Sequence, residues 1–344
     1  MPSGRAATKI RGRLILSAAA CLPLLLAACS SAAGTDPSAG GVLPSNTTPP
    51  PIASATPTAG VAAPLTGVPV AADIAGRSAV AVPVDVNPAR PPTGLNSADV
   101  VYAEWDGKST VRLTAIFQSQ DNGAVGPVAG LSAADAKLLP VIKPVLAAGP
   151  TYAKFYRQAA AAGLNVASAS IRTSAFVQSG GAAYASTAAL RTLAVRGSTA
   201  PPRLFPIAVP GEAFANSGVR PVTSFRVPSA SQQVFAWTWD PAQKRYHATV
   251  GGTTVSAANV IVMSMGYKTI LAKAPQGPAI PTADVFGSGA AYAVSGGKGV
   301  SARWARNGPL KVHTFATADG TSLRFAPGPT WVIFEPLGNA WAVG

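Results

Sequence analysis

"PVDVNPARPPTGLNSADVVYAEW", residues 83–105, holds the pattern that decides the fold of this chain. Apolar runs stand at its two ends, and a long loop rich in Pro, Gly and Asn separates them. Together with the neighbouring residues, this pattern predicts three β-rich segments, at 79–86, 98–105 and 110–118. Pro83 lies inside the first segment and has no N–H to donate, which predicts an edge strand or a bulge there.

The rest of the first half mixes helices with strands. "SAADAKLL" begins at Ser132 and has the capping-box pattern, with Asp135 three residues further on. Residues 151–163 and 187–197 each predict a short helix that ends in glycine. The first half is therefore expected to be of mixed type.

The second half has the pattern of β-strands almost throughout. Phe235, Trp237 and Trp239 alternate in "VFAWTWD", and "DPAQ" turns the chain into "KRYHATV". Alternating aromatic residues predict a packed core or a cross-strand stack rather than a platform for a ligand. Further apolar runs follow at hairpin spacing, at residues 259–265, 290–294, 300–305, 311–317, 322–325 and 330–336.

The N-terminus has the pattern of a bacterial lipoprotein signal. Four cations precede an apolar run, Leu14–Ala28, which is shorter than the roughly 20 residues of a spanning helix. "LAAC", residues 26–29, fits a lipobox, which predicts a signal peptide over 1–28 and lipid on Cys29. The alternatives are an ordinary secretory signal and an uncleaved anchor. Cys21 leaves with the signal, so no thiol remains for a disulfide, a metal site or a nucleophile.

Residues 29–63 predict a tether between this lipid and a folded body. The segment consists mainly of Ser, Thr, Pro, Gly and Ala, without a hydrophobic period. Two acyl chains suffice for stable membrane anchoring, so we expect the protein at the outer face of the cytoplasmic membrane.

The composition indicates a folded, basic body. Hydrophobic residues make up 48% and charged residues 12% of the chain, which excludes charge-driven disorder. Without the four signal cations, 23 Lys and Arg face 13 Asp and Glu, a net charge of +10. Such a charge suits anionic neighbours such as a wall polymer. No nucleic-acid-binding module is recognisable, so we expect no nucleic acid as a partner.

One acidic constellation stands out in the first half. Five of the 13 acids lie within 37 residues, beside Arg90 and Arg112: Asp85, Asp99, Glu104, Asp106 and Asp121. Paired carboxylates can perform acid–base chemistry, which makes Asp85, Asp99 and Glu104 the candidate catalytic residues. Alternatively, Asp85 and Asp99 accept backbone hydrogen bonds in turns and pair with Arg90. Candidate binding residues are Arg90, Asp85, Asp99 and Arg112.

The loop at residues 87–95 predicts a clamp. An Arg between prolines has few local partners, so Arg90 is expected to bond Asp85 or Asp99. Gly94 is expected to supply a positive φ that turns Leu95 into the core.

Other catalytic and cofactor motifs carry little weight. His247 and His313 lie singly in expected strands, and no Gly-x-Ser-x-Gly occurs. Ser295 and Lys298 match Ser-x-x-Lys, but the two glycines between them predict a hairpin turn instead of the helical turn that this chemistry needs. Neither a dinucleotide motif nor a metal-ligand cluster is present, so no cofactor and no metal are expected.

Residues 83–105, followed by "RLTAIFQSQDNGAVGPV" at 112–128, resemble the YerB-like lipoproteins, a Gram-positive and actinobacterial family without an assigned function. The resemblance extends to "TWVIFEP" at 330–336. It implies an α+β fold with sheets covered by helices: an N-terminal mixed domain at 64–200 and a C-terminal β-rich domain at 201–344. The chain departs from the family pattern at Val86, at 129–132 and at 180–184, where relatives carry polar side chains.

Three functions are compatible with these observations. The leading one is a non-catalytic binding or adaptor lipoprotein of the cell envelope, whose partner is an envelope protein or an anionic wall polymer. The second is a hydrolase of envelope glycan or phosphoester that uses the candidate carboxylates. The third is a solute-binding receptor, which the missing alternation of strands and helices in the second half disfavours.

Overall fold

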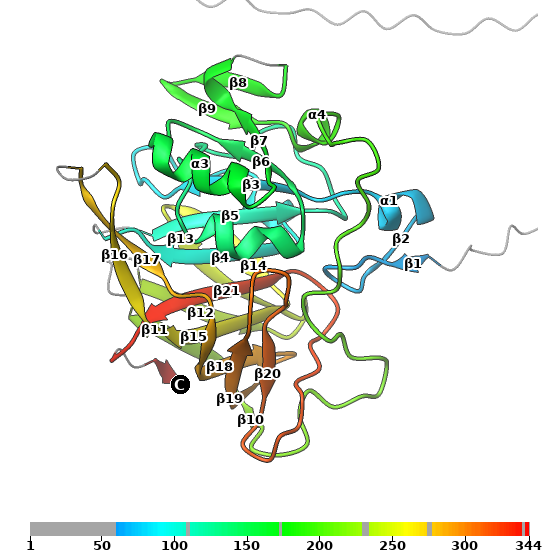
Figure 1. Cartoon of the computed structure of the whole chain (residues 1–344). Helices are drawn as coiled ribbons and strands as arrows, with labels where there is room; N and C mark the ends of the chain where they lie inside the picture. The colour runs from blue at the N-terminus through cyan, green and yellow to red at the C-terminus, as the bar shows by residue number, and fades with distance from the viewer. Residues whose placement is uncertain are drawn as a thin grey trace, which may run out of the picture. The chain divides into compact units, whose positions relative to one another are not determined.

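The computed structural model describes residues 60–107, 111–171, 174–228, 234–273, 277–338 and 341–343 (Figure 1). The signal peptide, Cys29 and nearly all of the expected tether lie outside these residues. Within the described residues, no helix has the length and the apolar character that a membrane crossing requires.

One large sheet joins the two halves of the sequence. Its members, in spatial order, are β10 (Arg220–Pro221), β19 (Lys298–Arg306), β18 (Gly287–Ser295), β15 (Asn259–Met265), β21 (Thr330–Pro336), β4 (Val100–Trp105), β5 (Val111–Phe117), β3 (Val80–Asp85), β6 (Val145–Ala148) and β7 (Asn165–Ser168), with β20 (Thr314–Ala316) paired to β19. The halves meet where β21 runs parallel to β4. The expected division into two domains near residue 200 stays a prediction.

A second sheet consists of strands from the second half alone. Its order is β14 (Thr253–Ala257), β13 (Arg245–Val250), β12 (Val234–Asp240), β11 (Ser224–Pro228) and β22 (Ala342–Val343). The described residues also form three separate strand pairs: β1 (Val61–Ala62) with β2 (Pro69–Val70), β8 (Phe176–Ser179) with β9 (Ala182–Ala185), and β16 (Tyr267–Leu271) with β17 (Ala279–Ala283).

The helices are short. They are α1 (Ala72–Gly76), α2 (Asp135–Leu138), α3 (Ala153–Ala161) and α4 (Thr187–Arg191), with 3-10 turns η1 (Leu95–Ser97), η2 (Leu139–Val141) and η3 (Ala169–Ile171). The helices expected within 151–163 and 187–197 are thus present, although each is shorter than its sequence pattern. The expected capping box is present only in part: Asp135 accepts the Ser132 N–H at 2.8 Å, but α2 begins at Asp135 and the Ser132 hydroxyl accepts from the N–H of Ala134 instead.

Alternate residues of the large sheet face two different cores. Val82 and Leu113 belong to a cluster that includes Trp237 of the second sheet. Ala81 and Ile116 belong to a cluster on the other face that includes Phe155 of α3. Because both faces are covered, these strands are buried along nearly their whole length, as their near-continuous apolar sequences require.

Strands predominate over helices in this fold. The expected mixture of the two is present, and Figure 1 shows α3 in front of the sheet near β3 and β6. The opposite face, however, packs against the second sheet. The expectation of sheets covered by helices therefore holds for only part of one face.

Pro83 lies in an inner strand, so the expected edge position is wrong. β3 runs between β5 and β6, but β6 pairs only with Val80 and Ala81. Beyond that point the Pro83 carbonyl accepts from the N–H of Ala129 at 2.9 Å. Since the N–H and C=O of a strand residue point the same way, the missing donor faces this irregular segment and disturbs no strand ladder.

The hairpins expected in the second half are largely confirmed. β12 and β13 pair antiparallel, and Trp237 is fully buried, stacked on Phe225 with ring centroids 6.5 Å apart. The run at 295–298 is a hairpin turn, as expected, and both of its glycines have positive φ. Residues 322–325 form only isolated bridges instead of a strand.

Candidate binding cleft

Asp85, Arg112 and Glu104 lie side by side on three neighbouring strands. Asp85 of β3 opposes Arg112 of β5, and Arg112 in turn opposes Glu104 of β4. Directly paired residues project from the same face of a sheet, so the three side chains share one face. With strands about 4.8 Å apart, the backbones of Asp85 and Glu104 are about 10 Å apart. The fold thus brings together three of the residues expected to form a site.

Arg112 is held by Asp135 at the start of α2. Its Nη2 lies 2.5 Å from Oδ2 of Asp135 and its Nη1 lies 3.2 Å from Oδ1, a two-pronged pair. The Arg112 Nε donates to the Gly130 carbonyl at 2.8 Å. The side chains of Arg112 and Asp135 are 12% and 2% exposed, so the pair is largely shielded from solvent.

Glu104 is buried beside this pair. Its Oε1 accepts the N–H of Ala283 at 3.0 Å, and its Oε2 accepts the Ser132 hydroxyl at 2.9 Å. Burial raises the pKa of Glu104 to about 7, although Arg112, at 3.8 Å, opposes this rise. Glu104 can therefore bind or release a proton near neutral pH.

Two adjoining clefts open at this end of the strands. The Glu104 cleft has a volume of about 340 Å³ and is lined by Glu104, Arg112, Tyr152, Trp105 and residues 278–281, among others. The Arg90 cleft, about 480 Å³, is lined by Arg90, residues 127–130, Ser170, Gln178 and residues 181–183, among others. Asp85, Ala129, Gly130 and Pro150 line both, so the two clefts meet at Asp85.

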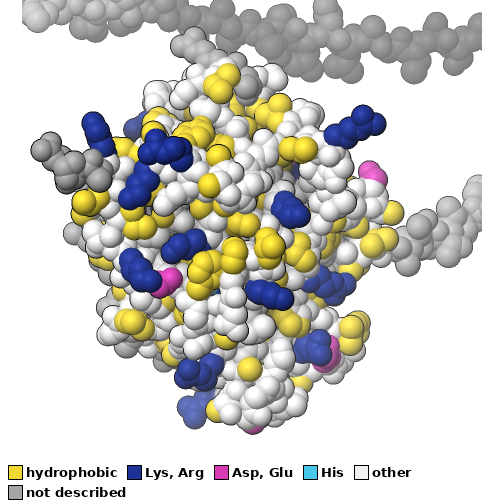
Figure 2. Space-filling view, viewed as in Figure 1, with side chains coloured by type: hydrophobic (Ala, Val, Ile, Leu, Met, Phe, Trp, Pro, Cys, Tyr) yellow, Lys and Arg dark blue, Asp and Glu magenta, His cyan; other side chains and the backbone are white. Residues whose placement is uncertain are grey.

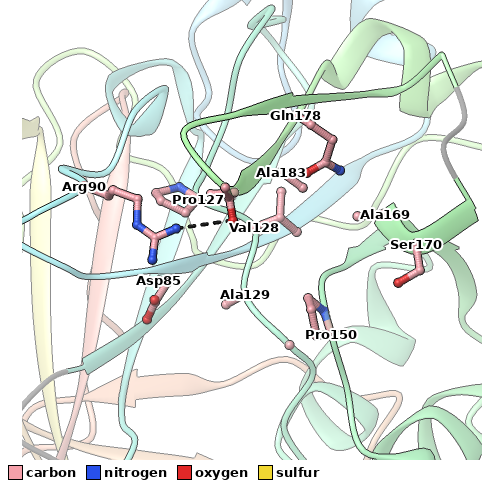
Figure 3. A pocket seen from close by; sticks show the side chains of 13 residues that line it. Asp85, Arg90, Pro127, Val128, Ala129, Pro150, Ala169, Ser170, Gln178 and Ala183 are labelled. Atoms are coloured by element: carbon pink, nitrogen blue, oxygen red, sulfur yellow. Dashed lines mark hydrogen bonds between the residues drawn. The ribbon is translucent and has the colours of Figure 1, made fainter.

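Figure 3 shows the polar groups of the Arg90 cleft. Arg90 and Asp85 lie on one side, and the side chains of Gln178 and Ser170 lie on the other. Asp85, Arg90, Gln178 and Ser170 are all exposed. The cleft therefore presents a carboxylate, a guanidinium, an amide and a hydroxyl to whatever enters it.

The expected clamp between Arg90 and an Asp is wrong. Arg90 donates from Nη1 to the Gly181 carbonyl at 3.4 Å, in the turn between β8 and β9. In the described part of the chain, neither Asp85 nor Asp99 bonds or ion-pairs with Arg90. The cause is that Asp99 lies at the far end of β4, while the loop carrying Arg90 folds against the β8–β9 turn. The expectation for Gly94 is confirmed, because its φ is +79° and Leu95 is buried.

Asp99 serves the structure at the opposite end of β4. Its Oδ2 accepts the N–H groups of Gln118 and Ser119, and its Oδ1 accepts the Ser119 hydroxyl. Asp99 is 1% exposed, and burial raises its pKa. It lines neither the Glu104 cleft nor the Arg90 cleft.

Asp121 and Asp106 also fall into separate places. Asp121 accepts from Arg77 at 2.7 Å and from Arg191 at 2.8 Å, near the Asp99 end of the sheet. Asp106 lines the Glu104 cleft. The acidic constellation of the sequence is thus divided by the fold into two groups.

Sequence reasoning missed several groups at the clefts. Asp135 and Ser132 were expected only as a helix cap, yet they also hold Arg112 and Glu104. Arg112 lies in an apolar run that predicts a buried strand, and this could have suggested a further acid close to its guanidinium. Gln178 and Ser170 carry no sequence pattern that sets them apart from other surface residues.

The histidines contribute to neither cleft. His313 is buried, and burial lowers its pKa to about 3. His247 has Nε2 3.9 Å from Oδ2 of Asp240, on the second sheet. Throughout the described ranges, no group of three or more His, Cys, Asp and Glu side chains is placed to hold a metal ion.

Comparisons of sequence assign the chain to a family. Residues 65–198 match the "Protein of unknown function (DUF3048) N-terminal domain", and residues 225–332 match the "Protein of unknown function (DUF3048) C-terminal domain". The chain is 45% identical over 67 residues to the Bacillus subtilis (strain 168) protein named "Putative lipoprotein YerB". The chain belongs to the YerB-like family.

A crystal structure of YerB from Bacillus subtilis has the same fold. It matches this YerB-like chain with a TM-score of 0.67 at 20% sequence identity, over 82% of this chain and 99% of that one. The resemblance seen in the sequence is therefore confirmed. The match to the curated YerB sequence spans 19% of this chain and 20% of that protein.

Some of the positions that were expected to depart from the family pattern lie together, whereas Val86 lies outside the cleft. Ala129, Gly130 and residues 181–183 line the Arg90 cleft. The cleft of this YerB-like chain is therefore walled largely by backbone and small side chains, with Arg90 and Asp85 as its charged groups.

Proposed function

We propose that the chain is a lipid-anchored envelope lipoprotein that binds an extended polar segment, from an envelope protein or an anionic wall polymer, without catalysis. One observation carries this proposal: the two clefts meet at Asp85, where Asp85 and Arg90 are exposed and share no ion pair within the described residues. Buried charges such as Arg112 are already satisfied by the protein. Exposed ones in a cleft are available to a ligand.

A photo-crosslinking experiment in cells tests this binding. A photoreactive residue at Gln178, which lines the Arg90 cleft, should capture a recurrent partner. The control places the same residue at Val209, which is 65% exposed and lines neither cleft. Equal capture at both positions, or none at Gln178, would contradict the proposal.

The membrane anchor is supported by the lipobox at Cys29 and by the name of the Bacillus relative. Changing Cys29→Ala should yield an unprocessed or shed protein, because no acyl chain can then be attached. Fractionation of membranes and medium provides the measurement. An unchanged membrane-bound, processed protein would show that the anchor lies elsewhere.

A second candidate function is the hydrolysis of an envelope glycan. The observation that favours it is a carboxyl group in the Glu104 cleft whose pKa is about 7, two strands away from Asp85. Glu104 would protonate the leaving oxygen, and Asp85 would take a proton from the attacking water, as in inverting glycosidases. Asp99 has no part in this scheme, because it lies at the other end of β4.

Release of reducing ends from cell-wall glycan by the purified full chain tests this alternative. The activity should disappear in Glu104→Gln and in Asp85→Asn. Activity that persists in both variants, or no release by the parent chain, would exclude the hydrolase and leave binding as the function.

A further inference from the structure

A long part of the sequence carries only positive charge. Residues 136–211 contain eight Lys and Arg and not one Asp or Glu: Lys137, Lys143, Lys154, Arg157, Arg172, Arg191, Arg196 and Arg203. Figure 2 shows a face of the molecule on which Lys and Arg greatly outnumber acidic residues. Of these cations, Arg191 pairs with Asp121, and Lys137 lies 4.0 Å from Asp284. Among the described residues, Lys143, Lys154, Arg157, Arg196 and Arg203 form no ion pair.

A third cleft lies within this basic segment. It has a volume of about 340 Å³ and is formed by residues 141–143 on one side and by residues 195–200 with Pro202 on the other. No acidic residue lines it, and it shares no lining residue with the Arg90 or Glu104 clefts. Its volume falls within the range of small-molecule sites, about 300–1,000 Å³.

Lys143 and Arg196 supply the charge of this cleft from its two sides. Both are exposed, and in the described part of the chain neither forms an ion pair or a side-chain hydrogen bond. A guanidinium offers several N–H groups in a fixed fork, and an ammonium adds a compact point charge. This combination favours an oxyanion with several acceptor oxygens.

The backbone at Lys143 adds an independent argument. Its φ is +51°, a left-handed conformation at the end of η2, where glycine is the favoured residue. In the described residues, Lys244 is the other non-glycine residue with positive φ. A lysine at this position is strained, and the ammonium that it places in the cleft offers a reason for its presence.

We propose that the cleft between residues 141–143 and 195–202 binds the phosphate group of a phosphoester, with Lys143 and Arg196 contacting its oxygens. Phosphate fits the two cations, the absence of acids in the lining and the hydroxyl group of Thr199 at the wall, whereas the Ser198 hydroxyl donates to the Val195 carbonyl at 2.7 Å. The cleft has room for a glycerol or sugar unit attached to the phosphate. Two sources have this chemistry at the cell envelope: the headgroup of an anionic phospholipid and a phosphate-bearing wall polymer.

Titration of the full chain in neutral detergent tests the site. The probe is glycerol phosphate, and its binding is measured by calorimetry at about 0.15 M salt. At this ionic strength, long-range attraction between the probe and exposed cations is largely screened. The parent chain should bind in a saturable manner. Lys143→Gly should weaken binding roughly tenfold or more, because it removes a charge-assisted contact while relieving the left-handed backbone. Arg196→Gln should do the same without altering the backbone.

Lys244→Gly is the matched control. It removes the same charge from the same backbone conformation in the β12–β13 hairpin, outside the cleft. It should change the affinity by less than about twofold, and all three variants should melt at or near the parent temperature. Equal weakening by Lys143→Gly and Lys244→Gly would show diffuse attraction and overturn the site, as would the absence of saturable binding.

Competition then identifies the source of the phosphate. Micelles containing phosphatidylglycerol, but not phosphatidylcholine, should displace the probe if the ligand is a lipid headgroup. Oligomers of glycerol phosphate should displace it if the ligand is a wall polymer. The proposal is supported if either competitor displaces the probe from the parent chain and this displacement is lost in Lys143→Gly. It is overturned if neither competitor displaces the probe.

Discussion

Strand β4 has a buried acid at each end, but the Glu104 end opens into a cleft that also holds an exposed acid. Asp99, at one end, is buried among donors that the protein itself supplies. At the other end Glu104 lines a cleft, and Asp85, two strands away, is exposed. The two ends are about 17 Å apart along the strand. Residue type therefore does not separate the buried acid Asp99 from the exposed acid Asp85 in this protein; the local supply of donors and the access of solvent do.

The largest effect is expected from Arg112→Met. This change leaves Asp135, which is 2% exposed, and Glu104 without their cation. Removing one partner of a buried pair costs about 3–5 kcal/mol in the free energy of unfolding. Urea unfolding at neutral pH measures this loss. A loss below about 1 kcal/mol would mean that solvent already screens the pair of Arg112 and Asp135. These side chains would then be more exposed to solvent than their 12% and 2% indicate.

At the Asp99 end of β4, Asp99→Ala should lower the free energy of unfolding by about 3 kcal/mol or more. Two backbone N–H groups and the Ser119 hydroxyl lose their acceptor, and each buried donor left unpaired costs about 1–3 kcal/mol. Ser119→Ala, which removes one of these bonds, is the graded control. If Asp99→Ala melted like the parent, the structural assignment of Asp99 would fail.

The pH dependence of stability should distinguish Glu104 from its glutamine variant. Its pKa is about 7 in the folded state and near 4.5 when unfolded. Below pH 4.5 both states are protonated, and between pH 4.5 and 7 the unfolded state ionises first, so stability falls as pH rises. The fall amounts to about 3 kcal/mol and is complete above pH 7.

Glu104→Gln should lack this fall. The stability of the parent relative to the variant should therefore decrease by about 3 kcal/mol between pH 4 and pH 8, measured by urea unfolding across that range. Parallel curves for the two proteins would show that Glu104 does not titrate near neutrality, and would remove the basis of the hydrolase alternative.

The smallest effect on stability is expected at Arg90, in the cleft at the Glu104 end of the strands. Arg90→Ala removes an exposed side chain whose one described hydrogen bond, to the Gly181 carbonyl, is 3.4 Å long. The free energy of unfolding should change by no more than about 0.5 kcal/mol. A loss of 1–3 kcal/mol would restore Arg90 as a structural clamp, the role that its sequence context had indicated.

Much of the fold could be predicted from the sequence because its signals are local. Alternating or continuous apolar runs placed β3, β4, β5, β12, β15 and β21 close to their observed bounds. The positive φ of Gly94 and the hairpin turn at Gly296 and Gly297 were predicted correctly, because glycine itself favours such backbone conformations. The edge position predicted for Pro83 was wrong. A proline is accommodated in this inner strand because β6 stops pairing before Pro83, and no local sequence pattern indicates where that pairing stops.

The site was predicted only in part, since it depends on register. Nearness in sequence grouped Asp99 with Asp85 and Glu104, whereas strand pairing brings Asp85, Arg112 and Glu104 into one row and leaves Asp99 outside it. Asp135, the main partner of Arg112, comes from a different element 23 residues away. The second sheet and the course of the Arg90 loop were equally beyond local patterns.

The most direct test of the contrast between the two ends combines capture with stability. Photo-crosslinking from Gln178 is measured in cells for the parent, the double variant Asp85→Asn with Arg90→Ala, and Asp99→Ala, with the melting temperature of each. The double variant should melt like the parent and lose its adducts, whereas Asp99→Ala should melt lower and lose adducts only in proportion to unfolding. The proposed binding site at Asp85 and Arg90 would be contradicted if the folded double variant kept its adducts. It would also be contradicted if folded Asp99→Ala lost them.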